Sequence, residues 1–188
     1  MAQAKKKCRL YTDGLSKGNP GKGAIGILIC DEKDKVLKEY GETIGHCTNN
    51  EAEYKALIKG LELAAKYDEV SHFSDSELMV NQVNKGSRVK AANLRGLVEE
   101  VWELEGGFSK VTHTWVSRES KMITLADGVA NEALENKKPK KTGVHTIECM
   151  CGESVIFRRV DRVDGKILSI CECGRIWTMD ESERLRAK

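Results

Sequence analysis

The stretch Cys8–Gly14, with the sequence CRLYTDG, decides the fold of this chain. Its apolar character favours a β-strand, so we expect a short strand over residues 8–13 that ends in Asp13. An acidic residue at the end of an apolar strand points to function. An Asp-Gly pair is also common in tight turns, and taken alone Asp13 fits that interpretation better.

Outward from this strand, the pattern predicts an α/β fold with a five-stranded mixed sheet flanked by helices. Three meandering strands come first, with a turn at residues 31–34, and helices then alternate with two further strands. The remaining strands are expected at residues 24–30, 35–44, 70–75 and 110–116, and the helices at 50–67, 76–84, 91–105 and 124–135.

A second acidic residue, Glu53, is expected on the inner face of the first helix. Helical spacing places it in one stripe with Leu57, Leu61 and Ala64. Glu51 instead falls on a solvated face, where Lys55 is its i,i+4 partner. A Glu that faces the core needs a partner, which is either a metal ion or a Lys or Arg in a buried salt bridge.

Two more acidic residues follow the same pattern. Asp75 ends the fourth strand, and Asp127 falls in the first turn of the last helix. Asp75 also suits a helix cap, and Asp127 suits a capping box with Thr124. Four carboxylates on elements that this topology brings together repel one another unless cations lie between them. Such a set suggests divalent metal ions, and two-metal sites typically cleave phosphodiesters.

Four motifs occur in family-like order and spacing, and together they resemble the type 1 ribonuclease H family in its compact archaeal and bacterial branch. The resemblance covers about residues 8–135. Its motifs are YTDGLSKGNPG at 11–21, TNNEAE at 48–53, SDSEL at 74–78 and ADGVANEAL at 126–134.

This resemblance implies a ribonuclease H-like fold and an endonuclease that hydrolyses the RNA strand of RNA–DNA hybrids. It implies that Asp13 lies on the central strand. The implied catalytic residues, which would also bind two Mg²⁺ or Mn²⁺ ions, are Asp13, Glu53, Asp75 and Asp127. The implied substrate-binding residues are Gly14, Asn19, Thr48, Asn49, Asn50 and Ser76. Capping of the helix by Thr48 or Asn49 is compatible with that role.

The chain departs from the family pattern in the loop before Asp127. Ser117 stands where many members carry a histidine, and His113 on the preceding strand reads as structural. Glu77 replaces a common glutamine. The long basic handle of some members is missing, which leaves a sparse basic set that is also typical of a solvated face. This set consists of Lys85, Arg88, Lys90 and Arg95. A catalytically inactive nucleic-acid-binding module and a 3′–5′ exonuclease therefore remain alternatives.

The composition changes after the last helix, where residues 137–144 form a basic linker between domains at 1–136 and 145–188. The second domain is β-rich, with a hairpin turn signal at Asp164-Gly165. Two Cys-x-Cys-Gly units resemble a zinc ribbon that holds one structural Zn²⁺, although Cys-x-x-Cys is the usual spacing. The proposed ligands are Cys149, Cys151, Cys171 and Cys173. A Cys₄ iron site and a disulfide pair are the alternatives.

Charge and composition set further expectations. Residues 1–136 carry a net charge of −2 and residues 137–188 one of +4, so a ribbon that grips hybrid or recruits a protein partner is plausible on charge. No apolar run spans a membrane, and no secretory signal is evident, so we expect no membrane partner and a cytoplasmic location. Cys8 and Cys30 read as small core residues. Cys47 is expected in a loop, where a reactive role is the alternative.

Overall fold

The computed structural model describes residues 5–135 and, beyond them, the backbone of five short strands between residues 145 and 179. The chain divides into two compact units, Met1–Lys137 and Lys138–Lys188, and each is described by itself. No helix in the described part of the chain is long and apolar enough to cross a membrane.

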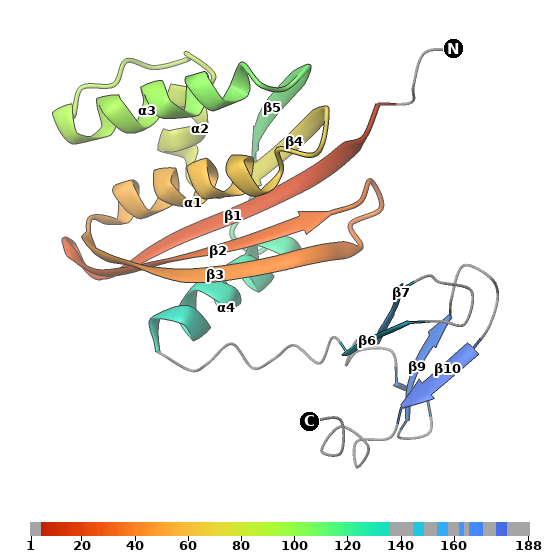
Figure 1. Ribbon diagram of the computed structural model, residues 1–188. Helices are drawn as coiled ribbons and strands as arrows, with labels where there is room; N and C mark the ends of the chain where they lie inside the picture. Colours follow the sequence, from red (N-terminus) through yellow and green to blue (C-terminus); the bar gives the residue numbers. More distant parts are fainter. Residues whose placement is uncertain are drawn as a thin grey trace. The chain divides into compact units, whose positions relative to one another are not determined.

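The first unit is built on a five-stranded mixed sheet, as the sequence predicts (Figure 1). The strand order is β3-β2-β1-β4-β5, which puts β1 in the centre. β1 pairs antiparallel with β2 and parallel with β4, and β4 pairs parallel with β5. The strands are β1 Lys7–Gly18, β2 Gly21–Cys30, β3 Val36–Cys47, β4 Glu69–Ser74 and β5 Lys110–Trp115.

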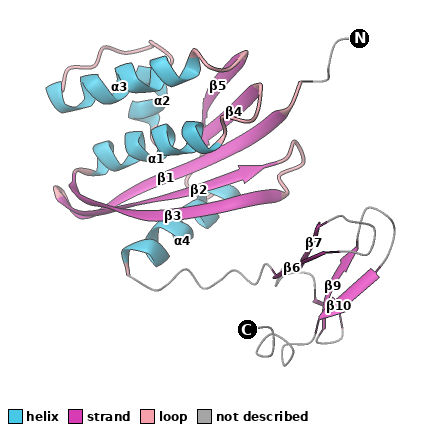
Figure 2. Ribbon diagram, viewed as in Figure 1, coloured by secondary structure: helices cyan, strands magenta, loops and turns pink. Residues whose placement is uncertain are grey.

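Helices cover both faces of this sheet (Figures 1 and 2). The helices are α1 Asn49–Leu63, α2 Glu77–Val83, α3 Ala92–Glu105 and α4 Lys121–Leu134. A large core lies between the sheet and α1, α2 and α3, and a smaller one lies beneath α4, around Tyr11, Leu28 and Ile123. The apolar stripe predicted for α1 is confirmed, because Leu57, Leu61 and Ala64 are all buried.

The first strand is longer than the sequence predicts. It continues through Asp13 and Gly14 to Gly18, so the Asp-Gly pair makes no turn here. The reason is non-local: β2 supplies antiparallel partners along the whole second half of β1, with Asp13 opposite Gly26 and Gly14 opposite Ile25. A strand that is paired with a neighbour along its whole length continues through a local turn signal.

The last helix begins three residues before its predicted start. A turn in which the Ser120 N–H donates to the Ser117 carbonyl leads into α4 at Lys121. Thr124 therefore lies inside the helix, where its hydroxyl donates to the Ser120 carbonyl at 3.1 Å. The predicted capping box of Thr124 and Asp127 is wrong, and Asp127 lies in the second turn of α4.

The second unit contains two small antiparallel sheets, one of β6 and β7 and one ordered β10-β9-β8. Its strands are β6 His145–Glu148, β7 Ser154–Phe157, β8 Arg162–Val163, β9 Lys166–Ile170 and β10 Ile176–Met179. β8 and β9 pair on either side of Asp164-Gly165, where a hairpin turn is predicted. The basic linker at 137–144 and the four candidate zinc ligands, Cys149, Cys151, Cys171 and Cys173, lie outside the described residues.

Candidate active site

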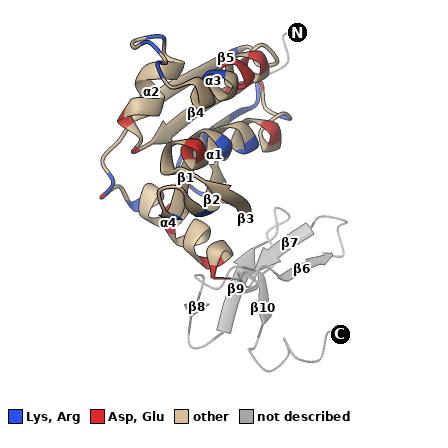
Figure 3. Cartoon of the chain, turned by 90° about the vertical axis from the view of Figure 1, so that its left-hand side faces the viewer, with Lys and Arg blue, Asp and Glu red and all other residues tan. Residues whose placement is uncertain are grey.

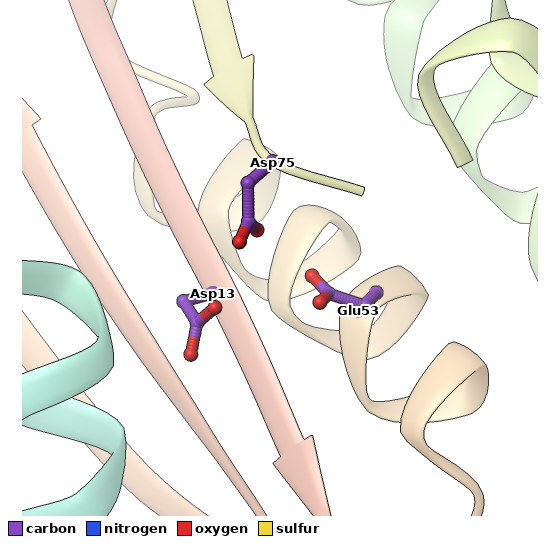
Figure 4. Close-up of side chains that lie close together, drawn as sticks. All are labelled: Asp13, Glu53 and Asp75. Atoms are coloured by element: carbon purple, nitrogen blue, oxygen red, sulfur yellow. The ribbon is translucent and has the colours of Figure 1, made fainter. Parts of the chain in front are cut away.

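Three of the four predicted acidic residues converge at one point (Figure 4). Asp13 comes from the middle of β1, Glu53 from the start of α1, and Asp75 directly follows β4. One carboxylate oxygen from each residue lies within 4.8 Å of the other two. Residues that are 40 and 22 positions apart in the chain thus form one cluster.

Strand pairing and a close helix contact explain this convergence. The parallel pairing of β1 with β4 ends at Tyr11 and Phe73, and beyond this point the two strands separate in a fork. Asp13 and Asp75 each lie two residues past the last pair, so they come to the same place at the opening of this fork. Glu53 is brought in because α1 rests directly on Gly14. A Cβ atom at Gly14 would lie 2.2 Å from the Ala52 carbonyl carbon, a distance that only glycine permits.

Asp13 and Glu53 are buried and Asp75 is half-buried, and neither Asp13 nor Glu53 has an ion-pair partner among residues 5–135. Asp13 is 4% exposed and Glu53 is 6% exposed. Within residues 5–135, one oxygen of each carboxylate is buried without a hydrogen-bond partner, and no Lys or Arg forms an ion pair with Glu53. The alternative of a buried salt bridge for Glu53 is therefore wrong for this part of the chain. Asp75 does not cap α2 either, because Ser76 is the N-cap residue.

Electrostatics make Asp13 and Glu53 hard to ionise. Burial, followed by repulsion from Asp127 and Asp75, raises the pKa of Asp13 to about 7. Burial, followed by repulsion from Asp13 and Asp75, raises the pKa of Glu53 well above its ordinary value, against a hydrogen bond from the Gly14 backbone that lowers it. Unpartnered buried oxygens that repel one another fit a divalent cation, since Mg²⁺ and Mn²⁺ prefer hard oxygen ligands.

Asp127 lies beside this cluster but outside it. Its side chain is 35% exposed, and its Oδ1 lies 4.0 Å from a guanidinium nitrogen of Arg118. The same guanidinium lies 3.8 Å from Oδ2 of Asp75. At 79% exposure, Arg118 contributes little to stability through these contacts. Its place between two acids was not predicted, since nothing in the local sequence distinguishes it from a solvated Arg.

Four of the six predicted substrate-binding residues form a polar edge beside the start of α1, namely Asn19, Thr48, Asn49 and Asn50. The Asn49 N–H donates to Asn19 Oδ1 at 3.1 Å, which joins the end of β1 to this helix. Thr48 is the N-cap residue, as one of the two predicted alternatives has it. Asn49 and Asn50 are exposed. Gly14 is buried under α1, and Ser76 is the half-buried N-cap residue of α2.

Glu51 differs from its prediction. It is half-buried and completes a capping box with Thr48, and its second carboxylate oxygen accepts a hydrogen bond from Asn93 on α3. The expected ion pair with Lys55 gives way to these bonds. The local pattern missed the change because Asn93 is 42 residues away in the chain.

The basic residues lie in the loop between α2 and α3 and at the start of α3 (Figure 3). Arg95 donates to the carbonyls of Val89 and Lys90, both at 3.4 Å, and so holds the end of this loop against α3. Lys85 adopts a left-handed backbone conformation, with its ammonium 5.0 Å from the Trp102 ring centroid. Arg88 and Lys90 lie in the loop between α2 and α3.

A histidine pair lies beside the central strand, with His72 on β4 and His113 on β5. His72 contacts Thr12 Oγ1 at 2.8 Å through Nε2 and contacts His113 at 2.9 Å through Nδ1. His113 in turn lies 2.8 Å from Glu105. Burial, followed by repulsion from His113, lowers the pKa of His72 well below its ordinary value. A 4%-exposed His113 side chain in this chain of contacts agrees with a structural role.

The three described cysteines are all buried. Cys8 and Cys30 lie in strands, as predicted, and burial raises their pKa values to about 11 and about 12. Cys47 was expected in a loop, but it is the last residue of β3 and 3% exposed. Burial raises its pKa as well, so the thiolate that a reactive role would need is disfavoured.

Comparison with known proteins places this site in a family. A family model described as reverse transcriptase-like matches residues 11–133, more than half of the chain. A crystal structure of RNase H1 from the halophilic archaeon Halobacterium salinarum superimposes with a TM-score of 0.67 at 37% identity, over 69% of this chain and 98% of that one. The chain belongs to the type 1 ribonuclease H family.

Other ribonuclease H proteins give the same picture. Ribonuclease HI of Halobacterium salinarum is 38% identical over 128 residues, which are 67% of this chain and 63% of that protein. The bifunctional protein Rv2228c of Mycobacterium tuberculosis is 36% identical over 132 residues, but the match spans only 36% of its length. The structure of LC11-RNase H1 in complex with RNA/DNA hybrid has a TM-score of 0.65 at 35% identity, covering 69% of this chain and 98% of that one.

Proposed function

We propose that this protein is an endonuclease that hydrolyses the RNA strand of RNA–DNA hybrids with the help of two divalent metal ions. The observation that carries the proposal is the buried cluster of Asp13, Glu53 and Asp75, whose unpartnered oxygens fit cations of the Mg²⁺ type. Membership of the ribonuclease H family supports the choice of substrate. The LC11 relative, whose structure contains RNA/DNA hybrid, supports it further.

In this proposal the carboxylates of Asp13, Glu53, Asp75 and Asp127 hold the metal ions. Bound ions of this kind activate a water and stabilise the leaving 3′-oxygen. The protein supplies the rigid placement of these carboxylates, through the fork between β1 and β4 and the contact of α1 with Gly14. Within residues 5–135, His72 and His113 bond to Thr12, to each other and to Glu105 rather than to the cluster, so we assign no histidine a proton-transfer role.

Substrate recognition falls to the polar edge. Asn19, Thr48, Asn49 and Asn50 present amides and a hydroxyl that suit contacts with phosphates and with the 2′-OH, which distinguishes RNA from DNA. The basic residues of the loop between α2 and α3 add sequence-independent attraction to the backbone.

Cleavage of three labelled duplexes tests this function. Wild-type protein is incubated with RNA–DNA hybrid, duplex DNA and duplex RNA in Mg²⁺ or Mn²⁺, beside Asp13→Asn and Asp75→Asn. We expect cleavage of the RNA strand of the hybrid alone and its loss in both variants. Wild-type activity in either variant would refute the metal assignment. Binding without cleavage would favour the inactive module, and release of mononucleotides from one 3′ end would favour an exonuclease.

We also propose that residues 145–188 form a zinc-ribbon domain after a linker at 137–144. Two Cys-x-Cys-Gly units support it, each between two strands that pair antiparallel. The four thiolates would bind one structural Zn²⁺, and this domain would grip hybrid or recruit a protein partner. Metal analysis tests it: we expect one zinc per wild-type chain and none after Cys149→Ser with Cys171→Ser. Unchanged zinc content in that variant would refute the assignment.

A further inference from the structure

The carboxylate of Glu51 joins the start of α1, which carries part of the polar edge, to the start of α3. Oε2 of Glu51 accepts hydrogen bonds from the Thr48 N–H at 2.7 Å and the Thr48 hydroxyl at 2.8 Å. Its Oε1 accepts from the side-chain amide of Asn93 at 3.0 Å. Thr48 is followed by Asn49, which is bonded to Asn19. Glu51 thereby joins the start of α1 to the start of α3, and the separate bond between Asn49 and Asn19 joins the start of α1 to the β1–β2 turn.

A capping box accounts for the bonds to Oε2 but not for the bond to Oε1. The box needs one carboxylate oxygen to reach back to the N-cap N–H, and Oε2 does this. The bond from Oε1 to Asn93 adds nothing to the cap of α1, since Asn93 lies in the first turn of α3. Both arms are hydrogen bonds to a carboxylate, and such bonds are stronger than those between neutral groups.

Asn93 directly follows the basic loop. Lys90 precedes it by three residues, and Arg95, two residues later, holds the carbonyls of Val89 and Lys90. The tie from Glu51 to Asn93 therefore fixes where this basic segment stands relative to the amides of Asn49 and Asn19. Two groups of phosphate-binding side chains bind one duplex together only if their separation matches its backbone.

We infer that Glu51 is a positioning residue for nucleic-acid binding: it sets the separation between the amide edge at Asn19, Thr48 and Asn49 and the basic segment before Asn93. This inference rests on the proposed function. Glu51 touches neither the substrate nor the acidic cluster in this role. Its loss therefore weakens the binding of hybrid and leaves the hydrolytic step unchanged.

Three variants of the full-length protein test the inference. Glu51→Gln keeps the shape of the side chain but replaces one acceptor oxygen by a donor that faces Thr48 or Asn93. Asn93→Ala removes the tie alone and favours helix at that position, so α3 does not unfold. Glu62→Gln is the matched control, because Glu62 is on the same helix and its side chain pairs with Lys59 on the helix surface. It makes the same change of charge.

Steady-state cleavage of hybrid in Mg²⁺ is measured for each protein, with the melting temperature recorded beside it. We expect Glu51→Gln and Asn93→Ala to raise KM about three- to tenfold, the effect of one lost charge-assisted hydrogen bond, with kcat within about twofold of wild type. Glu62→Gln should match the wild type in both constants.

The outcomes separate this inference from the function beneath it. If wild type cleaves hybrid and Glu51→Gln shares the KM of Glu62→Gln, Glu51 is a cap only and the inference is wrong. If kcat and melting temperature fall together at unchanged KM, the role is purely structural, which also overturns it. If wild type does not cleave hybrid at all, the proposed function fails, and this inference fails with it.

Discussion

The backbone of Glu53 rests against Gly14, so close that a methyl group on Gly14 would lie 2.3 Å from the Glu53 nitrogen. The helix α1, which carries Glu53, is thus packed directly against Gly14, the residue that follows Asp13. The spacing of the cluster depends on this contact, since no side chain larger than hydrogen fits between β1 and α1 at that point.

Gly14→Ala should therefore displace α1 and carry Glu53 away from Asp13. We expect kcat on hybrid to fall about 100-fold, the loss that a misplacement of about 1 Å produces, together with a destabilisation of about 1–3 kcal/mol from overpacking. Gly96→Ala is the control, because a Cβ there meets nothing within 4 Å. It should keep full activity and gain about 0.5–1 kcal/mol. Full activity in Gly14→Ala would contradict this account of Glu53.

Metal-free protein should become more stable when Asp13 loses its charge. The pKa of Asp13 is raised from 3.8 to about 7, so between those pH values the folded state holds a proton that the unfolded state has released. Its free energy of unfolding therefore falls as pH rises from about 4 to about 7, by an amount on the order of a few kcal/mol. Asp13→Asn removes this term.

Denaturant unfolding in a chelator checks this prediction. Asp13→Asn should exceed wild type in stability at pH 8, and the difference should shrink as the pH is lowered toward 4. Mg²⁺ added in place of the chelator should stabilise wild type more than the variant. A ligand of the folded state raises the free energy of unfolding, and the variant has lost one carboxylate that would bind the ion. Parallel pH curves for the two proteins would count against a buried, repelled Asp13.

Asp127→Asn should be the mildest of the four carboxylate substitutions. Asp127 is more exposed than Asp13 or Glu53 and lies outside the group whose oxygens come within 4.8 Å of one another. We expect its residual kcat to exceed that of Asp13→Asn by about tenfold or more, consistent with roughly 1.4 kcal/mol less lost transition-state stabilisation. A metal titration of both variants measures this, and equal inactivity at every Mn²⁺ concentration would contradict it.

His72 should make the fold sensitive to acid. Its pKa is lowered in the folded state, so below the unfolded value of about 6.5 the unfolded chain binds a proton that the folded chain excludes. The free energy of unfolding from this residue is complete above that pH and is lost as pH falls below it. His72→Gln should flatten the acid side of the stability curve, whereas a substitution at exposed His46, such as His46→Gln, should leave it unchanged. Urea midpoints between pH 4.5 and 8 decide between these outcomes.

Periodicity predicted much of this molecule because it is a local property. The apolar stripe of α1 distinguished Glu53 from Glu51 without any knowledge of the sheet, and the order of strands and helices followed from their patterns. The strand and helix ends depend on distant partners instead. β1 passes Gly14 because β2 pairs with it, and α4 begins at Lys121, after a serine turn, rather than at Thr124.

The neighbours of the site were harder to predict for the same reason. Glu51 bonds to Asn93 on another helix, and Arg118 lies between Asp75 and Asp127, which come from different elements. Each of these contacts joins residues whose spacing along the chain carries no periodic signal. Motif order located the acids, but only the packed structure shows that Asp127 stands apart from the other three.

The fork where β1 and β4 cease to pair also bears on how this chain tolerates changes of length. Side chains alternate along a strand, so one residue inserted into the six-residue β4 would send Asp75 to the opposite face of the sheet. The turn at residues 31–35 joins β2 to β3. Residues added there leave the register of β1 with β2 and that of β1 with β4 unchanged. The positions of the acidic residues therefore depend on the lengths of β1 and β4. We expect insertions to be tolerated in the β2–β3 hairpin turn and not in these two strands.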